Sequence, residues 1–394
     1  MQFISIICAI LALSIIILFH EFGHFIFAKI FKVGVIEFSL GMGPRIISFV
    51  KNNTRYSWKV IPFGGSCAMI GEDPSGSGDF SSYGGAYDEN TGLVDFDGVK
   101  FPKDEISKIS FNNIMPYKKL LIAFAGPLFN FILAFIVSLV IVFFTGIDKP
   151  IIRNVSENSP ATIAMPYTLQ NGDEILSLET PNKKSKVVVT RDITLFMYIN
   201  DQYFTNEKYP LGITFKRDGQ ILETIVKPQY NEEVKRNIIG ISFKNESLKP
   251  QNVIQLVQFT FYEIGFCLNS TITSLQLLFS GQLSANEISG PIGTVAIMGS
   301  SISEASTYGL LSGFLVFINL ISVISANLGV MNLLPIPALD GGRIVFSIYE
   351  MISGRKVNEK VERLVNGASM LLLLLLMIFI MGSDIYKLIP FLSK

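Results

Sequence analysis

The segment His20-Glu21-Phe22-Gly23-His24 has the residue types and the spacing of a metal-dependent hydrolytic site. Side chains four positions apart lie on one face of a helix, so the two imidazoles can bind the same zinc ion. A glutamate at the second position can act as general base toward a water molecule. The pattern predicts zinc ligands at His20 and His24 and a catalytic Glu21. The alternative is a chance match between two interfacial histidines, and these are the only histidines in the chain.

The motif closes an apolar run, which favours a functional site over a chance match. Residues 3–19 are almost entirely Ile, Leu, Phe, Ala and Cys. Ionisable groups at the edge of a membrane-spanning segment are costly and are usually kept for a function. The run lacks the charged start and the small-residue cleavage site of a signal peptide, so we expect residues 1–31 to form a permanent transmembrane helix.

Composition supports a membrane protein and excludes other classes. Hydrophobic residues make up 49% of the 394 residues and charged residues only 16%, whereas globular domains have about 25% charged residues. The chain has 32 basic and 32 acidic residues and no basic stripe, so no nucleic-acid partner is expected. The three cysteines are far apart and predict no disulfide framework.

Four apolar stretches exceed the roughly 20 residues that cross a bilayer core. They predict a polytopic α-helical membrane protein with transmembrane helices at residues 1–31, 118–146, 308–342 and 364–390. Lysine and arginine concentrate near the ends of the loops that join the first to the second and the third to the fourth helix. The positive-inside rule places both loops in the cytoplasm, with both termini and the region between the second and third helices outside.

The connecting regions have distinct patterns. Residues 32–117 form the first loop, and the alternation of residues 56–70 around Gly64-Gly65 predicts a bent β-hairpin, with an ordinary cytosolic hairpin as the alternative to a membrane-associated one. Residues 73–97 are rich in Gly, Ser and Asp and predict a flexible loop. Residues 147–249 contain short β-type runs and predict one soluble β-rich domain. Residues 250–284 predict an amphipathic helix at the membrane surface, or else a packed linker helix.

A third metal ligand is predicted at Asp340. It follows Pro335 and Pro337, which cannot continue a helix, and it precedes two glycines that allow a tight turn. A catalytic zinc needs three protein ligands and one open position. The alternative is that Asp340 caps the following helix. The lack of further histidines and the position on the cytoplasmic side of the membrane both favour ligation.

Taken in order, four motifs resemble the site-2 protease family of intramembrane zinc metalloproteases, of the bacterial kind that cleaves membrane-bound anti-sigma factors. The motifs are His20-Glu21-x-x-His24, Gly126-Pro127-x-x-Asn130, Ser289-Gly290-Pro291-Ile292-Gly293 and Asn332-x-x-Pro335-x-Pro337-x-Leu339-Asp340-Gly341. The resemblance covers nearly the whole chain. It implies Zn²⁺ held by His20, His24 and Asp340, with Glu21 activating water. It also implies an inner-membrane location with the active site toward the cytoplasm.

The resemblance further implies a β-element at residues 61–72 that lies against the substrate, and a PDZ-like domain on the outer, periplasmic side. The latter rests on Ser159-Pro160-Ala161 and Asn171-Gly172-Asp173. The outer region has room for one such domain, whereas enterobacterial members have two. Residues 165–168 also depart from the family's small residues, which puts binding of a peptide C-terminus in doubt.

The resemblance implies cleavage of a pre-trimmed, single-span membrane protein within its transmembrane segment, releasing a cytoplasmic fragment in a stress response. The β-element at Gly64 and Gly65 is expected to bind the unwound substrate as an added strand. Asn130 and Asn332 are expected either to hold substrate or to form helix-packing hydrogen bonds. The alternatives are clearance of remnant signal peptides and a non-catalytic PDZ scaffold. A scaffold would not need the general base Glu21.

Overall fold

The computed structural model describes residues 2–72, 85–181, 183–206, 209–232, 234–243, 247–281 and 289–392. The chain forms two compact units. The first contains Met1–Val137 and Leu283–Lys394, and the second contains Ser138–Gln282. All residues of the predicted metal site lie in the first unit.

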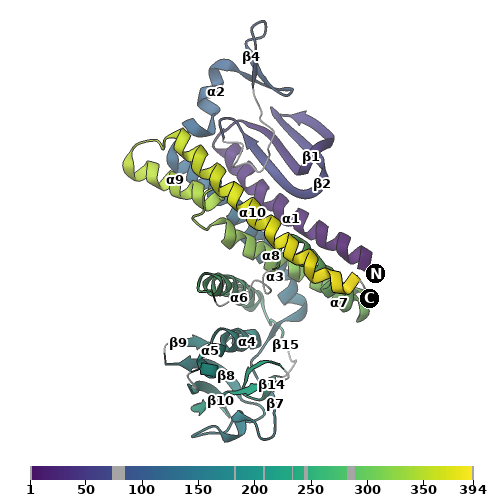
Figure 1. Ribbon diagram of the computed structural model, residues 1–394, viewed down its shortest axis with the longest axis vertical. Helices are drawn as coiled ribbons and strands as arrows, with labels where there is room; N and C mark the ends of the chain where they lie inside the picture. Colours follow the sequence, from purple (N-terminus) through teal and green to yellow (C-terminus); the bar gives the residue numbers. More distant parts are fainter. Residues whose placement is uncertain are drawn as a thin grey trace. The chain divides into compact units, whose positions relative to one another are not determined.

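Four helices of the described residues are long and apolar enough to cross a membrane. They are α1 (Gln2–Ile30), α3 (Pro116–Thr145), α8 (Leu310–Asn332) and α10 (Glu359–Leu392). Apolar side chains are exposed along each of them, which fits a lipid surrounding rather than water. The four predicted apolar helices are thereby confirmed by length and composition. In the first unit α1 packs against α7 (Pro291–Thr307) and α8, around a core that includes Ala12, Ile16 and Ile321 (Figure 1).

The third apolar helix ends earlier than the predicted range 308–342. Helix α8 stops at Asn332, and Asp340 begins a separate helix, α9 (Asp340–Ser353). Pro335 and Pro337 lie in the connection, where each lacks the backbone N–H that a continuous helix would use. A Cβ on Gly341 would lie 2.6 Å from the carbonyl carbon of Leu333. Glycine is therefore needed where the chain folds back to present Asp340.

The Ser289–Gly293 motif begins α7, a helix that the sequence patterns did not predict. Asp384 of α10 is buried and accepts hydrogen bonds from the backbone amides of Gly290 (3.1 Å) and Gly293 (2.8 Å). A Cβ on Gly293 would lie 2.8 Å from the Asp384 carboxylate, so only glycine allows this approach. A carboxylate also suits the positive end of a helix dipole. In this structure the motif joins α7 to α10.

The strands β1 (Val35–Lys51) and β2 (Thr54–Met69) are long, bent and antiparallel. Residues 35–40 of β1 pair on one side with residues 65–69 and on the other with residues 55–58 of β2. Residues 55–58 pair in turn with residues 47–50. The two strands thus form a four-segment sheet. We name residues 61–69 the edge segment. Its side facing away from residues 35–40, the outer side, pairs with none of the described strands.

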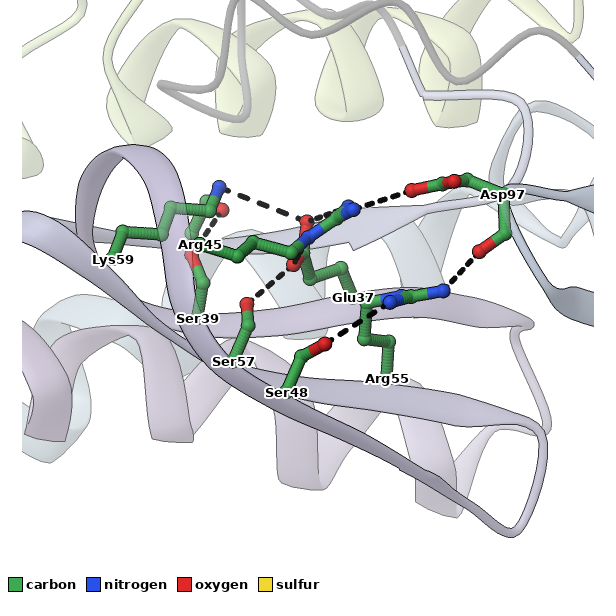
Figure 2. Close-up of polar contacts among 9 residues, drawn as sticks. Glu37, Ser39, Arg45, Ser48, Arg55, Ser57, Lys59 and Asp97 are labelled. Carbon is green, nitrogen blue, oxygen red and sulfur yellow. Dashed lines mark hydrogen bonds and ion pairs between the residues drawn. The ribbon is translucent and has the colours of Figure 1, made fainter.

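A buried polar network holds this sheet together (Figure 2). Glu37 is fully buried and accepts hydrogen bonds from Arg45 Nε (2.7 Å) and Nη2 (3.1 Å) and from the Ser57 hydroxyl. Lys59 Nζ lies 3.6 Å from the same carboxylate. Arg45 also pairs with Asp97, in the turn between two strands of a neighbouring sheet. A buried charge is tolerated when it is paired and hydrogen-bonded in this way.

That neighbouring sheet corrects part of the predicted flexible loop at residues 73–97. Strands β3 (Ala86–Asp88), β4 (Leu93–Phe96) and β5 (Val99–Pro102) form an antiparallel meander, followed by α2 (Lys103–Ile109) and a short 3₁₀ helix, η2 (Phe111–Asn113). Val94, Phe96 and Phe101 are buried in its core. The apolar residues of these short strands alternate with turn residues, so the composition of the segment indicated a loop. Residues 73–84 lie outside the described residues.

The second unit contains a four-stranded sheet in the order β11-β10-β8-β9. Its strands are β8 (Glu174–Thr180), β9 (Lys183–Lys186), β10 (Leu211–Arg217) and β11 (Gln220–Val226). Buried Ile175, Leu178 and Phe215 form its core. The remaining elements are β6 (Ile147–Asp148), β7 (Ile152–Val155), η3 (Pro160–Ile163), α4 (Thr190–Ile199), α5 (Asp201–Asn206), β12 (Gln229–Asn231), β13 (Arg236–Ile238), β14 (Ile241–Phe243), β15 (Ser247–Leu248) and α6 (Val253–Phe279).

Two ion pairs fix elements within this unit. Asp173 is 1% exposed and receives two hydrogen bonds of 2.7 Å from the guanidinium of Arg217, a bidentate geometry. Within the Asn171-Gly172-Asp173 motif, Asp173 therefore has a structural contact. Arg191 of α4 pairs with Glu263, the one charged residue of α6, so the β-rich part packs on that helix. Helix α6 begins three residues later and ends five residues earlier than the range 250–284 predicted for it.

Candidate metal centre

Three predicted ligands converge beside the C-terminal half of α1. His20 and His24 lie one helical turn apart on α1, and Asp340 is the first residue of α9. Asp340 Oδ2 lies 3.1 Å from His20 Nε2 and 3.3 Å from His24 Nε2, and the two Nε2 atoms are 3.3 Å apart. All three residues are buried. Leu339 holds the N-cap position of α9, so Asp340 does not cap the helix.

These distances fit the tetrahedral coordination of a cation. Zinc bonds of about 2.0–2.1 Å place neighbouring ligand atoms roughly 3.3 Å apart. Asp340 Oδ2 is fully buried and has no hydrogen-bond partner among the described residues, although it faces two ring nitrogens. A buried oxygen without a partner is costly, and a shared cation would satisfy it. Burial disfavours the charged carboxylate, but the facing imidazoles of His24 and His20 outweigh it and lower the pKa of Asp340.

Backbone and amide contacts orient the two imidazoles. His24 Nδ1 donates to the carbonyl oxygen of Ile122 in α3 at 2.8 Å, which leaves the Nε2 lone pair for a metal. His20 Nδ1 lies 3.2 Å from the side-chain amide of Asn130, also in α3. Asn130 Oδ1 is buried and has no partner in the described part of the chain. An amide rotated by half a turn would let this oxygen accept from His20 Nδ1–H.

Helix α3 approaches the imidazoles closely because Gly126 has no side chain. A Cβ built there would lie 2.7 Å from His20 Cε1, and closer still to His24 Nε2. On the facing helix, a Cβ on Gly23 would lie 2.7 Å from the carbonyl carbon of Ala125. Small residues at a helix crossing allow such close contact between membrane helices. The Gly126-Pro127-x-x-Asn130 motif thus brings α3 against the two predicted ligands of α1.

The remaining predicted site residues border the same centre. Asn332, at the end of α8, has its side-chain nitrogen 3.4 Å from His20 Nε2, on the metal side of the ring. Asn130 instead lies on the Nδ1 side. A Cβ on Gly65 of the edge segment would lie 3.2 Å from Glu21 Cγ, so the strand passes beside the predicted base. Gly64 has a φ of +89°, which accounts for the bend at this point.

Sequence reasoning missed a second group of residues next to the centre. Arg343, one turn after Asp340, pairs with Glu72, three residues beyond the end of β2. The arginine could have been noticed from its i+3 spacing to the third ligand. Its partner is 271 positions away in sequence, and no local pattern indicates that contact.

Comparisons with known proteins find relatives that match nearly the whole chain. The model of peptidase family M50 matches residues 8–376. A candidate zinc metalloprotease of Clostridium acetobutylicum is 32% identical over 385 residues, covering 98% of each chain. The protein named zinc metalloprotease RasP of Shouchella clausii is 29% identical over 449 residues, covering 98% of this chain and 99% of its own. RasP of Geobacillus kaustophilus is 27% identical over 437 residues, covering 97% and 98%.

Proposed function

Because the chain belongs to peptidase family M50, the site-2 protease family, we propose that His20, His24 and Asp340 hold the zinc of this intramembrane metalloprotease and that Glu21 is its general base. The family is zinc-dependent and acts on membrane substrates, and the motif resemblance to it is confirmed. The observation that carries the ligand assignment is the convergence of three buried ligand atoms, one of them an oxygen without a hydrogen-bond partner among the described residues.

Each residue of the centre has a distinct task in this proposal. A zinc ion held by His20, His24 and Asp340 would supply Lewis acidity for the scissile carbonyl and would lower the pKa of water to near neutral. Glu21 takes a proton from this water and returns it to the leaving amine. Asn130 orients His20 from the Nδ1 side, whereas Asn332 stands on the metal side, where a substrate carbonyl would lie. The imidazole of His24 is fixed by the backbone of α3.

We propose that the edge segment binds the substrate. A transmembrane helix must unwind before its peptide bonds can be cut, and its freed backbone groups then need partners. The outer side of the edge segment pairs with no described strand, and its Gly65 lies beside Glu21. An extended substrate added there as a strand would have its backbone satisfied at the catalytic base. The substrate class proposed is a pre-trimmed, single-span membrane protein of the anti-sigma factor type.

A direct test is metal removal from the purified protein with a model single-span substrate. Chelation is expected to lower cleavage by at least about 10²-fold, because Lewis acidity and water activation are both lost. Adding Zn²⁺ should restore the rate, whereas Mg²⁺ or Ca²⁺, which prefer oxygen ligands, should not. Cleavage that persists at the original rate after zinc has been shown to be absent would rule out the proposed chemistry.

We also propose a topology from the basic helix flanks. The metal centre and residues 32–117 face the cytoplasm, and residues 147–249, a PDZ-like domain by their motifs, lie outside the inner membrane. Reporter fusions after Lys51 and Arg355 should be cytoplasmic, and one after Lys227 should be external. A protease-accessible external tag after Arg355 in intact cells would contradict this orientation.

A further inference from the structure

One buried carboxylate joins the end of the edge segment to the helix of the third ligand. Glu72 Oε2 accepts a 3.1 Å hydrogen bond from the backbone amide of Met69, the last residue of β2. Its other oxygen, Oε1, accepts from Arg343 Nη2. The Glu72 side chain is 4% exposed. A single residue therefore closes the strand and receives the arginine of α9.

Arg343 makes a second contact to the same region. Its guanidinium stands over the ring of Phe111, 6.0 Å from the ring centre. The backbone amide of Phe111 in turn donates to the carbonyl of Ile70, directly after β2, at 2.8 Å. Arg343 is three residues after Asp340 in α9 and is itself 14% exposed. A planar guanidinium can stack and donate at once, which makes these contacts directional.

Both ends of this connection reach the reaction centre. Four residues before Met69, Gly65 lies beside Glu21, and one turn before Arg343, Asp340 faces the imidazoles. A buried ion pair adds little net stability because desolvation offsets the attraction, but removing one partner is severe. Such a pair can instead fix the geometry of the elements that it joins. A misplacement of about 1 Å between reacting groups can lower a rate by roughly 10²-fold.

We propose that Glu72 and Arg343 are a positioning pair that sets the distance between the edge segment and Asp340, and so places a substrate strand against the metal centre. The inference rests on the proposed function, since it assumes that the edge segment carries the substrate. Neither residue touches the reacting atoms in this proposal.

The test is the double variant Glu72→Gln with Arg343→Met in the full-length protein. It removes both charges together, and glutamine keeps an acceptor for the Met69 amide. We expect full zinc content, a KM close to that of the wild type and a kcat lowered by about 10- to 100-fold. Spin labels at exposed Ile61 and Tyr349, in a background without the native cysteines, should report a broader distance distribution between the edge segment and α9.

A second buried ion pair of α9 provides a matched control. Lys119 and Glu350 form another buried pair, 2.9 Å apart, which links α9 to α3 rather than to β2. Both pairs line one cavity of about 200 Å³. Lys119→Met with Glu350→Gln should leave kcat and the distance distribution near those of the wild type. Equal losses of kcat in the two double variants would overturn the proposal.

Other outcomes separate this inference from the function on which it rests. Unchanged kcat and an unchanged distance distribution in the first double variant refute the positioning role while leaving the protease assignment intact. Failure of the wild type to show zinc-dependent cleavage refutes the proposed function itself. Should the double variant not fold, Arg343→Lys replaces it, because lysine keeps the charge but loses the planar fork. A wild-type kcat in Arg343→Lys with the spin-label distances unchanged would also refute the proposal.

Discussion

Replacement of Glu21 by glutamine is expected to abolish proteolysis while leaving the zinc content near that of the wild type. Glutamine has the size of glutamate and cannot accept a proton, so general-base catalysis is lost and the fold is kept. Such catalysis contributes roughly 10²–10⁴-fold, and we expect a loss in kcat at the upper end of this range. Glu21 is not among the three converging ligand atoms, so metal binding should not need it.

The measurement is single-turnover cleavage of a model substrate together with zinc determination on the same preparation. Glu304→Gln on α7, an exposed carboxylate away from the centre, is the matched control and should cleave normally. Wild-type cleavage by Glu21→Gln would remove Glu21 from the mechanism. Loss of zinc in this variant would make Glu21 a ligand rather than a base.

Replacement of Asp340 by alanine should remove the zinc and with it all metal-dependent cleavage. Two neutral imidazoles remain, and they lack the charge and the third bond that a catalytic site requires. We expect the content to fall from about one zinc per chain to near zero after dialysis against a weak chelator. Retention of zinc in Asp340→Ala combined with His20→Ala would show that the ligand assignment is wrong.

A graded series extends this prediction to the residue behind His20. Asn130→Leu removes the amide that faces His20 Nδ1, and with it the oxygen that a rotated amide would offer to Nδ1–H. It should weaken zinc binding by about 10- to 100-fold, as is usual for partners of metal ligands. Asn130→Asp keeps an acceptor and should bind zinc more tightly than Asn130→Leu. Ser325→Ala is the control. The Ser325 hydroxyl donates to the backbone carbonyl of Asn130 at 2.8 Å, so its loss leaves the Asn130 side chain in place. Equal zinc affinity in Asn130→Leu and the wild type would refute this role.

Local patterns predicted the parts of the fold that local physics decides. Long apolar runs predict the spanning helices because about 20 apolar residues in a helix match the thickness of the bilayer core. A helix break was indicated by the prolines at 335 and 337 and by the glycines after Asp340. The predicted helix range 308–342 nevertheless included this break. The His20–His24 spacing placed two ligands on one face of α1, and these side chains do converge with Asp340 in the structure.

Contacts between distant segments could not be predicted from one sequence. An alternating run of residues indicates a strand, but it does not say that residues 35–40 pair with two parts of β2 at once. Arg45, one of the partners of Glu37, is only eight residues away in sequence. The positive φ angles of Gly41 and Gly43 let the chain between them turn back, and no alternation of residues indicates this. The positions of Glu72 and Arg343 are set by the whole unit. Such pairs carry no local periodicity or turn signal.

Gly126 shows that an absent side chain can be as necessary to a metal centre as a ligand. A Cβ there would press against ring atoms of both imidazoles, including His24 Nε2, which would hold the ion in our proposal. Loss of activity in a related chain could therefore arise on a helix that contributes no ligand. A chain that kept both histidines, the glutamate and the aspartate, but had alanine at this position, would pass a motif search as an active enzyme and yet bind no zinc.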